Sequence, residues 1–197
     1  MNFLAHAYLS FNHPEILVGN MISDFVKGKK KFGYSKGIQQ GIHLHRQIDN
    51  FTDTHEATRE ARTFLKPAVG LYSGAFVDVA YDRFLANDKS EFTEVLLQRH
   101  TARTYAVLNE YLEVLPPVFS AMLPHMENKN WLYNYRSLSG IQRSFEGVAK
   151  RASYLHSSTE VFGLFQEHYL LLQKCYNEFF PFVKAFTILE LEHLNPS

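Results

Sequence analysis

The chain has 197 residues, 46% of them hydrophobic, which is enough to form the core of one ordinary domain. Its 17 Phe and 11 Tyr exclude an intrinsically disordered chain, because disordered chains are poor in aromatic residues. The 20 basic residues balance 20 acidic ones, so the overall charge does not indicate a nucleic-acid binder.

Neither a targeting segment nor a membrane span is indicated by the sequence. The residues from Met1 to His6 lack the basic region and long apolar stretch of a signal peptide, and no run of about 18 apolar residues occurs. We therefore expect a cytoplasmic protein without membrane contact. The single cysteine, Cys175, excludes an intrachain disulfide and a thiolate metal site, so a metal would be held by His and carboxylate groups.

The 10 Gly and 7 Pro provide few turn signals, which favours long helices over many short strands. After an apolar segment over 3–11, a helix is expected to begin near Pro14 and to end at the lysines that start with Lys27. Further helices are predicted over 35–51, from about 53 to 65, and over 69–86, 91–113, 118–135, 139–152 and 159–193.

Three details refine these boundaries. Asp53 and Glu56 have the spacing of a capping box at the start of the fourth helix. Pro67 is expected to end that helix, and Pro124 to interrupt a later one. Because there is no repeat and no linker, the sequence predicts an all-α fold, a single-domain helical bundle over residues 1–197.

The aspartates are unevenly distributed. All six lie between residues 24 and 88, whereas the 109 residues from 89 onward contain 11 Glu and no Asp. Asp is a mediocre helix former, so an Asp inside a helix needs a specific reason. Capping accounts for Asp53 and Asp88, but four others lie within apolar-periodic segments: Asp24, Asp49, Asp78 and Asp82.

His45 and Asp49 are the clearest candidates for metal ligands. They are four residues apart, so a helix places them on one face, about 6 Å from each other. His6 and Asp24 could complete the site from the first two helices, and Asp78 from the fifth. This mixture of imidazole and carboxylate suits Mn²⁺, Fe²⁺ or Zn²⁺, whereas a purely oxygen site would suit Mg²⁺ or Ca²⁺.

A divalent ion held in this way favours hydrolysis of a phosphate ester. It lowers the pKa of a bound water and stabilises charge on a phosphoryl oxygen. Asp82 or Asp53 could orient that water or act as the base. The competing interpretation is structural, because a buried Asp paired with an Arg or a hydroxyl is commoner than a metal ligand.

We interpret the other histidines as surface residues or as buried residues with hydrogen-bond partners. His43 lies two residues from His45 on a different helical face, and His55 fits an exposed first turn. The rest are scattered: His13, His100, His125, His156, His168 and His193.

Five motifs follow one another in the first 90 residues: MNFLAH at 1–6, GNMISDFVKG at 19–28, GIHLHRQID at 41–49, FTD at 51–53 and DVAYDRFL at 78–85. In this order they resemble the motifs of the acyl-carrier-protein phosphodiesterases. The resemblance covers the full length, is concentrated in these 90 residues, and continues more weakly through 131–136 and 147–151.

This resemblance implies a helical fold similar to the HD-type metal phosphohydrolases, with His45 and Asp49 in place of their adjacent His-Asp pair. It implies removal of the 4′-phosphopantetheine arm from holo acyl carrier protein. The implied ion is Mn²⁺, with Mg²⁺, Fe²⁺ or Co²⁺ as alternatives. By position, the implied ligands are Asp24, His45, Asp49 and Asp78, followed by His6.

Cations are expected to serve the substrate in this interpretation. Arg46 or Lys27 would neutralise the phosphate. Because acyl carrier proteins are acidic, docking would use Lys27 and the lysines after it, together with Arg143, Lys150 and Arg151.

Two other functions compete with this one. The same metal site could serve a nucleotide or another small phosphodiester. Alternatively, the chain could be a non-catalytic helical binding module whose Asp and His are structural. The sequence does not indicate an oligomeric state.

Overall fold

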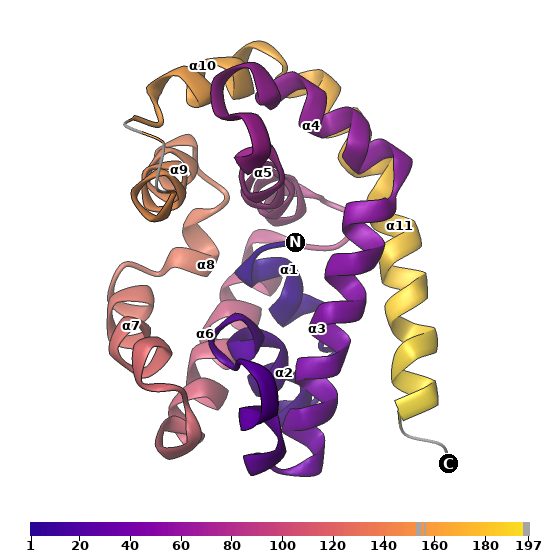
Figure 1. Cartoon of the computed structure of the whole chain (residues 1–197), viewed down its shortest axis with the longest axis vertical. Coiled ribbons are helices and arrows are strands. Elements are labelled where there is room, and N and C mark those ends of the chain that lie inside the picture. Colours follow the sequence, from indigo (N-terminus) through magenta and orange to yellow (C-terminus); the bar gives the residue numbers. More distant parts are fainter. Residues whose placement is uncertain (153–154, 156, 195–197) are drawn as a thin grey trace.

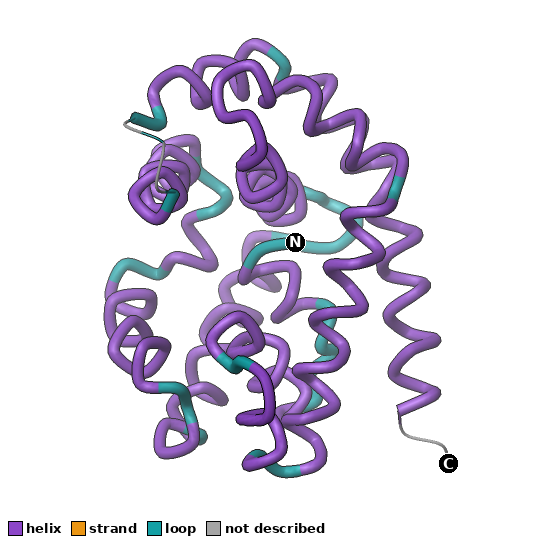
Figure 2. Tube along the Cα trace, viewed as in Figure 1, coloured by secondary structure: helices purple, strands orange, loops and turns teal. Residues whose placement is uncertain are grey.

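A computed structural model describes residues 1–152, 155 and 157–194 of the chain. Within them every regular element is a helix (Figure 2), which confirms the all-α class. None of the described helices has the length and apolar character needed to cross a membrane. The α-helices are α1 (Phe3–Tyr8), α2 (Pro14–Ile22), α3 (Lys36–Thr54), α4 (Glu56–Val69), α5 (Ser73–Asn87), α6 (Glu94–Glu110), α7 (Pro117–Asn128), α8 (Trp131–Asn134), α9 (Leu138–Arg151), α10 (Thr159–Glu167) and α11 (Tyr169–Leu194); short 3₁₀ turns span Ser23–Phe25, Gly28–Gly33, Gly70–Tyr72 and Leu112–Val114.

Helix α1 lies at the centre of the molecule (Figure 1) and contacts α2, α5 and α6. A helix of six residues is not stable alone, so α1 depends on tertiary contacts. Asp82, on α5, accepts hydrogen bonds from the backbone N–H of Leu4 at 2.8 Å and of Ala5 at 3.1 Å. Two of the free N–H groups at the start of α1 are thereby satisfied, and the helix that carries His6 is fixed to α5.

Helices α2 and α3 pack with their backbones in contact, and two glycines allow this. A Cβ on Gly19 would lie 2.1 Å from the carbonyl oxygen of Ile38, and one on Gly41 would lie 2.3 Å from that of Ile16. Neither position therefore accepts a side chain without moving the helices apart. The close crossing brings Asn20, which follows Gly19, next to His45, one turn after Gly41.

The other helices enclose this centre. The long helix α11 packs along α3, α4 and α5, while α9 packs on α5 (Figure 1). Aromatic side chains join these layers: Tyr81 stacks on Phe179 with ring centroids 5.2 Å apart, and Phe76 meets Phe145 edge-on at 5.0 Å. Cys175 is a free cysteine buried in α11.

Several helix boundaries differ from the predicted ones. The differences occur at the first turns of helices and at prolines. The predicted capping box of Asp53 and Glu56 is wrong, because α3 continues to Thr54 and the Nδ1 of His55 caps α4 by accepting from the N–H of Ala57 at 3.3 Å. Pro67 does not end α4, since a proline in the last turn removes only one hydrogen bond, and the helix runs on to Val69.

Pro124 likewise lies inside α7 without interrupting it. The break comes instead at Asn130, which has a left-handed backbone conformation with φ of 42°. The predicted helix over 159–193 is divided at His168 into α10 and α11. Asp24, expected inside the second helix, lies in the 3₁₀ turn after α2 because α2 ends at Ile22.

Candidate metal centre

Three segments of the chain meet around two histidine side chains. His6 comes from α1, His45 and Asp49 from α3, and Asp24 from the turn after α2. The Nε2 of His45 lies 3.0 Å from one oxygen of Asp49 and 3.3 Å from Asp24, while the Nε2 of His6 lies 3.2 Å from the other Asp49 oxygen. The structure thus brings together four of the five predicted ligands, and we call these residues the His–Asp cluster.

Asn20 orients both imidazoles of the cluster. Its side-chain N–H group donates to the carbonyl oxygen of His6 at 2.9 Å and to the hydroxyl of Ser10 at 3.1 Å, which fixes the amide orientation. The Oδ1 of Asn20 consequently faces the Nδ1 of His6 at 2.7 Å, and its backbone oxygen lies 2.7 Å from the Nδ1 of His45. Since both partners are acceptors, each ring carries its proton on Nδ1 and turns Nε2 toward the carboxylates.

The two Nε2 atoms are the chemically unusual feature of the cluster. Both are buried, and within the described part of the chain neither makes a hydrogen bond of ordinary geometry, although carboxylate oxygens lie 3.0–3.3 Å away. The rings of His6 and His45 stack with centroids 3.9 Å apart. A positive charge among these nitrogen and oxygen atoms would satisfy them, either a metal ion or a second proton on His45, whose pKa is raised to about 9 by the carboxylates.

A divalent ion fits this arrangement. The donor atoms of His6, His45 and Asp49 all lie within 4.8 Å of one another. Neighbouring ligands of an octahedral ion with bonds of about 2.1 Å stand about 3 Å apart, close to the spacing between Nε2 and the carboxylate oxygens. A mixture of imidazole and carboxylate suits Mn²⁺, Fe²⁺ or Zn²⁺.

The pKa values of the cluster residues reflect the close approach of the two imidazoles and the carboxylates. Burial and the nearby charge of His45 lower the pKa of His6 to about 4. Burial also acts to lower the pKa of His45, but the carboxylates of Asp24 and Asp49 raise it to about 9. Burial would raise the pKa of Asp49, but its close contacts with the two imidazoles and the nearby amino group of Met1 hold it well below its usual range. The carboxylates are therefore ionised and ready to bind a cation.

Asp78, the fifth predicted ligand, is not brought into this group. Its carboxylate lies 3.0 Å from the amino nitrogen of Met1, which is also 3.6 Å from Asp49. Burial alone would lower the pKa of this amino group, but Asp78 and Asp49 raise it to about 10, so it is charged. Asp78 is thus adjacent to the cluster through the amino group and does not share its ligand atoms.

The two carboxylates predicted as candidate bases are placed differently from that prediction. Asp82 is fully buried, and both its oxygens are occupied by the N–H groups of α1, so its role is to position that helix. Asp53 has a side chain 60% exposed and pairs with Arg62 on α4. Within the described residues, neither carboxylate forms a hydrogen bond or ion pair with a residue of the His–Asp cluster, so no contact supports either as the base.

Comparison with known proteins identifies the family. A family model described as acyl carrier protein phosphodiesterase matches residues 1–183. The chain belongs to this family. Among curated relatives, the acyl carrier protein phosphodiesterases of Salmonella dublin and Escherichia coli O157:H7 are 30% identical over 186 residues, covering 94% of this chain and 96% of each relative. That of Enterobacter sp. strain 638 is 29% identical over 182 residues, covering 92% and 94%. No solved structure matches.

In this member of the acyl carrier protein phosphodiesterase family, the cations predicted to serve the substrate lie in two places. Arg46 and Lys27 are exposed beside the turn that holds Asp24, and Arg46 donates to the backbone oxygen of Val26 at 3.3 Å. Arg143 and Arg151 are on α9, where they line a cavity that is also lined by Lys129 and Lys150. One set adjoins the cluster, and the other borders a separate cavity.

Sequence reasoning missed Asn20 as a functional residue. The available signal was a fully buried amide in the otherwise apolar helix before the Asp24 turn. Of the remaining histidines, His13, His125 and His193 are exposed, and His55 is half-buried as the cap of α4. None of the described ones belongs to the cluster, and His156 lies outside the described residues.

Proposed function

We propose that this chain removes the 4′-phosphopantetheine arm from holo acyl carrier protein by metal-dependent hydrolysis, with Mn²⁺ as the preferred ion. The observation that carries the proposal is the pair of buried Nε2 atoms, each fixed by Asn20 and aimed at Asp49, in a chain of the acyl carrier protein phosphodiesterase family. His6, His45, Asp49 and Asp24 would hold the ion.

The ion would supply Lewis acidity and an acidified water. The hydrolysis would balance as attack of a water molecule on phosphorus, cleavage of the bond between phosphorus and the serine oxygen, and transfer of a water proton to that oxygen. The products are apo carrier protein and 4′-phosphopantetheine. Asp24 has a side chain 76% exposed and only one oxygen beside His45, so its other oxygen would accept the proton from water, and Arg46 would neutralise the phosphate.

Docking of the acidic carrier protein would use the exposed cations of both groups, Lys27 near the cluster and Arg143 with Arg151 on α9. Attraction between exposed charges speeds association and is screened by salt. KM for the carrier protein should therefore rise with ionic strength, while kcat changes little. The cytoplasmic location expected from the sequence stays a prediction.

The decisive experiment is incubation of the purified protein with holo acyl carrier protein and Mn²⁺, with loss of the arm followed by mass spectrometry. Asp49→Asn should reduce turnover by about 10²-fold or more, because it removes a charged ligand from the site. Asp53→Asn is the matched control from the same helix and should retain turnover within about twofold.

No release of the arm with any divalent ion would refute the proposed activity. Turnover of nucleotides or small phosphodiesters alone would favour the second enzyme interpretation. A protein purified without chelators that contains no transition metal would favour the non-catalytic module.

A further inference from the structure

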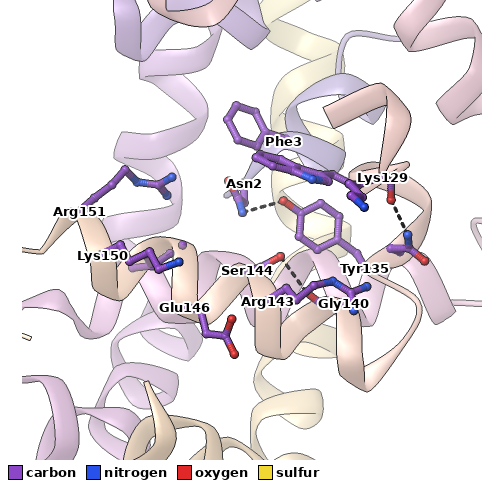
Figure 3. Close-up of a pocket in the computed structure, with 14 residues that line it drawn as sticks. Asn2, Phe3, Lys129, Tyr135, Gly140, Arg143, Ser144, Glu146, Lys150 and Arg151 are labelled. Carbon is purple, nitrogen blue, oxygen red and sulfur yellow. Dashed lines mark hydrogen bonds between the residues drawn. The ribbon is translucent and has the colours of Figure 1, made fainter. Parts of the chain in front are cut away.

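A cavity of about 310 Å³ opens between the N-terminal segment, α8 and α9 (Figure 3), and we call it the α8–α9 pocket. Phe3, Trp131 and Tyr135 supply aromatic surface, and Asn2 and Asn134 supply amide groups. The side chain of Asn2 donates to the Tyr135 hydroxyl at 3.0 Å, so this wall is held in place. A volume near 300 Å³ lies at the lower end of the range for small-molecule sites, and it is too small to accept the face of a protein.

The pocket and the His–Asp cluster share one short segment of chain. The amino group of Met1 contacts Asp49 and Asp78, and the next two residues line the pocket. Consecutive Cα atoms are about 3.8 Å apart, so the pocket wall begins within one or two residues of the cluster. Phe3 is also the first residue of α1, which presents His6 about one turn later.

The rim of the pocket is cationic. Arg143, Lys150 and Arg151 extend from α9 and Lys129 from the end of α7, against the single acid Glu146. Within the part of the chain that the structure describes, none of these four cations forms an ion pair. A rim of this kind suits an acidic macromolecule outside, while the floor suits a mostly uncharged ligand that carries amides and apolar carbon.

We propose that the α8–α9 pocket holds the pantetheine arm of the substrate while the acidic carrier protein rests on its cationic rim. This inference rests on the proposed function and adds the subsite for the leaving arm. Beyond its phosphate the arm is uncharged, with two amides, a hydroxyl, a dimethyl carbon and a thiol, which matches the rings and amides of the floor.

Gly147 offers a direct way to fill the pocket. It lies on the pocket wall in α9, and a Cβ added there would meet nothing within 4 Å, so Gly147→Leu fits without a backbone clash. Leu also has the higher helix propensity, and Gly147→Ala provides a smaller step. Gly163→Leu, in α10, is the matched control, since a Cβ there also meets nothing and the residue is not part of the pocket.

The binding test uses chelator-treated protein and free pantetheine, so its outcome does not depend on catalysis. Trp131 is the only tryptophan in the chain, and its fluorescence should change saturably as pantetheine binds, with equilibrium dialysis as the direct measure. Gly147→Leu should weaken pantetheine binding at least tenfold and raise KM for holo carrier protein at least tenfold, with Gly147→Ala intermediate. Gly163→Leu should behave like the unmodified chain.

Two results separate the pocket from the proposed function. If holo carrier protein is hydrolysed but dialysis detects no pantetheine binding, or Gly147→Leu leaves both Kd and KM unchanged, the assignment of the pocket is overturned. If pantetheine binds and Gly147→Leu blocks it while the unmodified chain releases no arm, the hydrolase proposal fails and the pocket remains a pantetheine site.

Discussion

Replacing Asn20 with leucine tests whether Asn20 supports the proposed metal site. Leucine has the same number and branching of side-chain heavy atoms as asparagine but removes three hydrogen bonds, to the Nδ1 and carbonyl oxygen of His6 and to Ser10, while the backbone oxygen that holds His45 remains. At about 1 kcal/mol for each bond, the variant should lose about 3 kcal/mol of unfolding free energy. A domain of this size melts about 2–4 °C lower for each kcal/mol, so Tm should fall by about 6–12 °C.

The effect on the metal is separate from this loss of stability. Without Oδ1 of Asn20, the imidazole of His6 loses its fixed tautomer and orientation, and loss of such a partner typically lowers metal affinity 10–100-fold. The Kd for Mn²⁺ is measured by competition with a chromogenic chelator, well below Tm. Ser10→Ala is the matched control, because it removes two hydrogen bonds to the same network without touching the His6 ring. It should lower Tm and leave the Kd within about threefold. Native Mn²⁺ affinity in Asn20→Leu would refute the role assigned to Asn20.

Three further predictions follow from the packing and the buried charges. Gly41→Ala should lower the unfolding free energy by about 1–3 kcal/mol in urea titrations and weaken Mn²⁺ binding, because its Cβ would overlap the carbonyl of Ile16; unchanged values would contradict the close helix crossing. Asp82→Asn should lower the unfolding free energy by about 1–3 kcal/mol, since an amide opposes one of the two N–H groups at the start of α1, and hydrogen exchange of α1 should rise with it. Burial and the charge of Arg103 lower the pKa of His100 to about 4 in the folded chain, compared with about 6.5 in the unfolded chain. The stability that neutral His100 contributes is therefore present above pH 6.5 and is lost as the pH falls toward 4. Between pH 7 and 5 the unfolding free energy of the unmodified chain should fall by about 2 kcal/mol more than that of His100→Phe. Equal decreases would show that His100 does not cause this loss of stability in acid.

The sequence correctly predicted those features that depend on the geometry of a single helix. Four-residue spacing put His45 and Asp49 on one helical face, and the structure finds them 3.0 Å apart. Apolar periodicity predicted most helices and the all-α class. These inferences succeeded because neighbours within a helix are fixed by its geometry, whatever surrounds it.

Contacts between elements were harder to predict. The sequence showed Asp82 in an apolar helix, but not that its partners were N–H groups 77 and 78 residues away. The spacing of Asp53 and Glu56 fits a capping box, yet hydrogen bonding at the end of α3 extended that helix past the predicted start of the next. Asn20 was visible only as a polar residue in an apolar run, and its contacts with both histidines arise from the helix crossing.

The hydrogen bonds from α1 to Asp82 also set the order in which the centre can be assembled during synthesis. The helix that carries His6 is held by a carboxylate that is added to the chain about 76 residues after His6. Until α5 has been made and has docked, only the α2–α3 pair can be in place, with His45 and Asp49 but without a fixed His6. Closing so long a loop is also entropically costly. We therefore expect a nascent chain to complete the proposed metal site only after residue 82 has left the ribosome, so that metal binding would report the docking of α1 on α5.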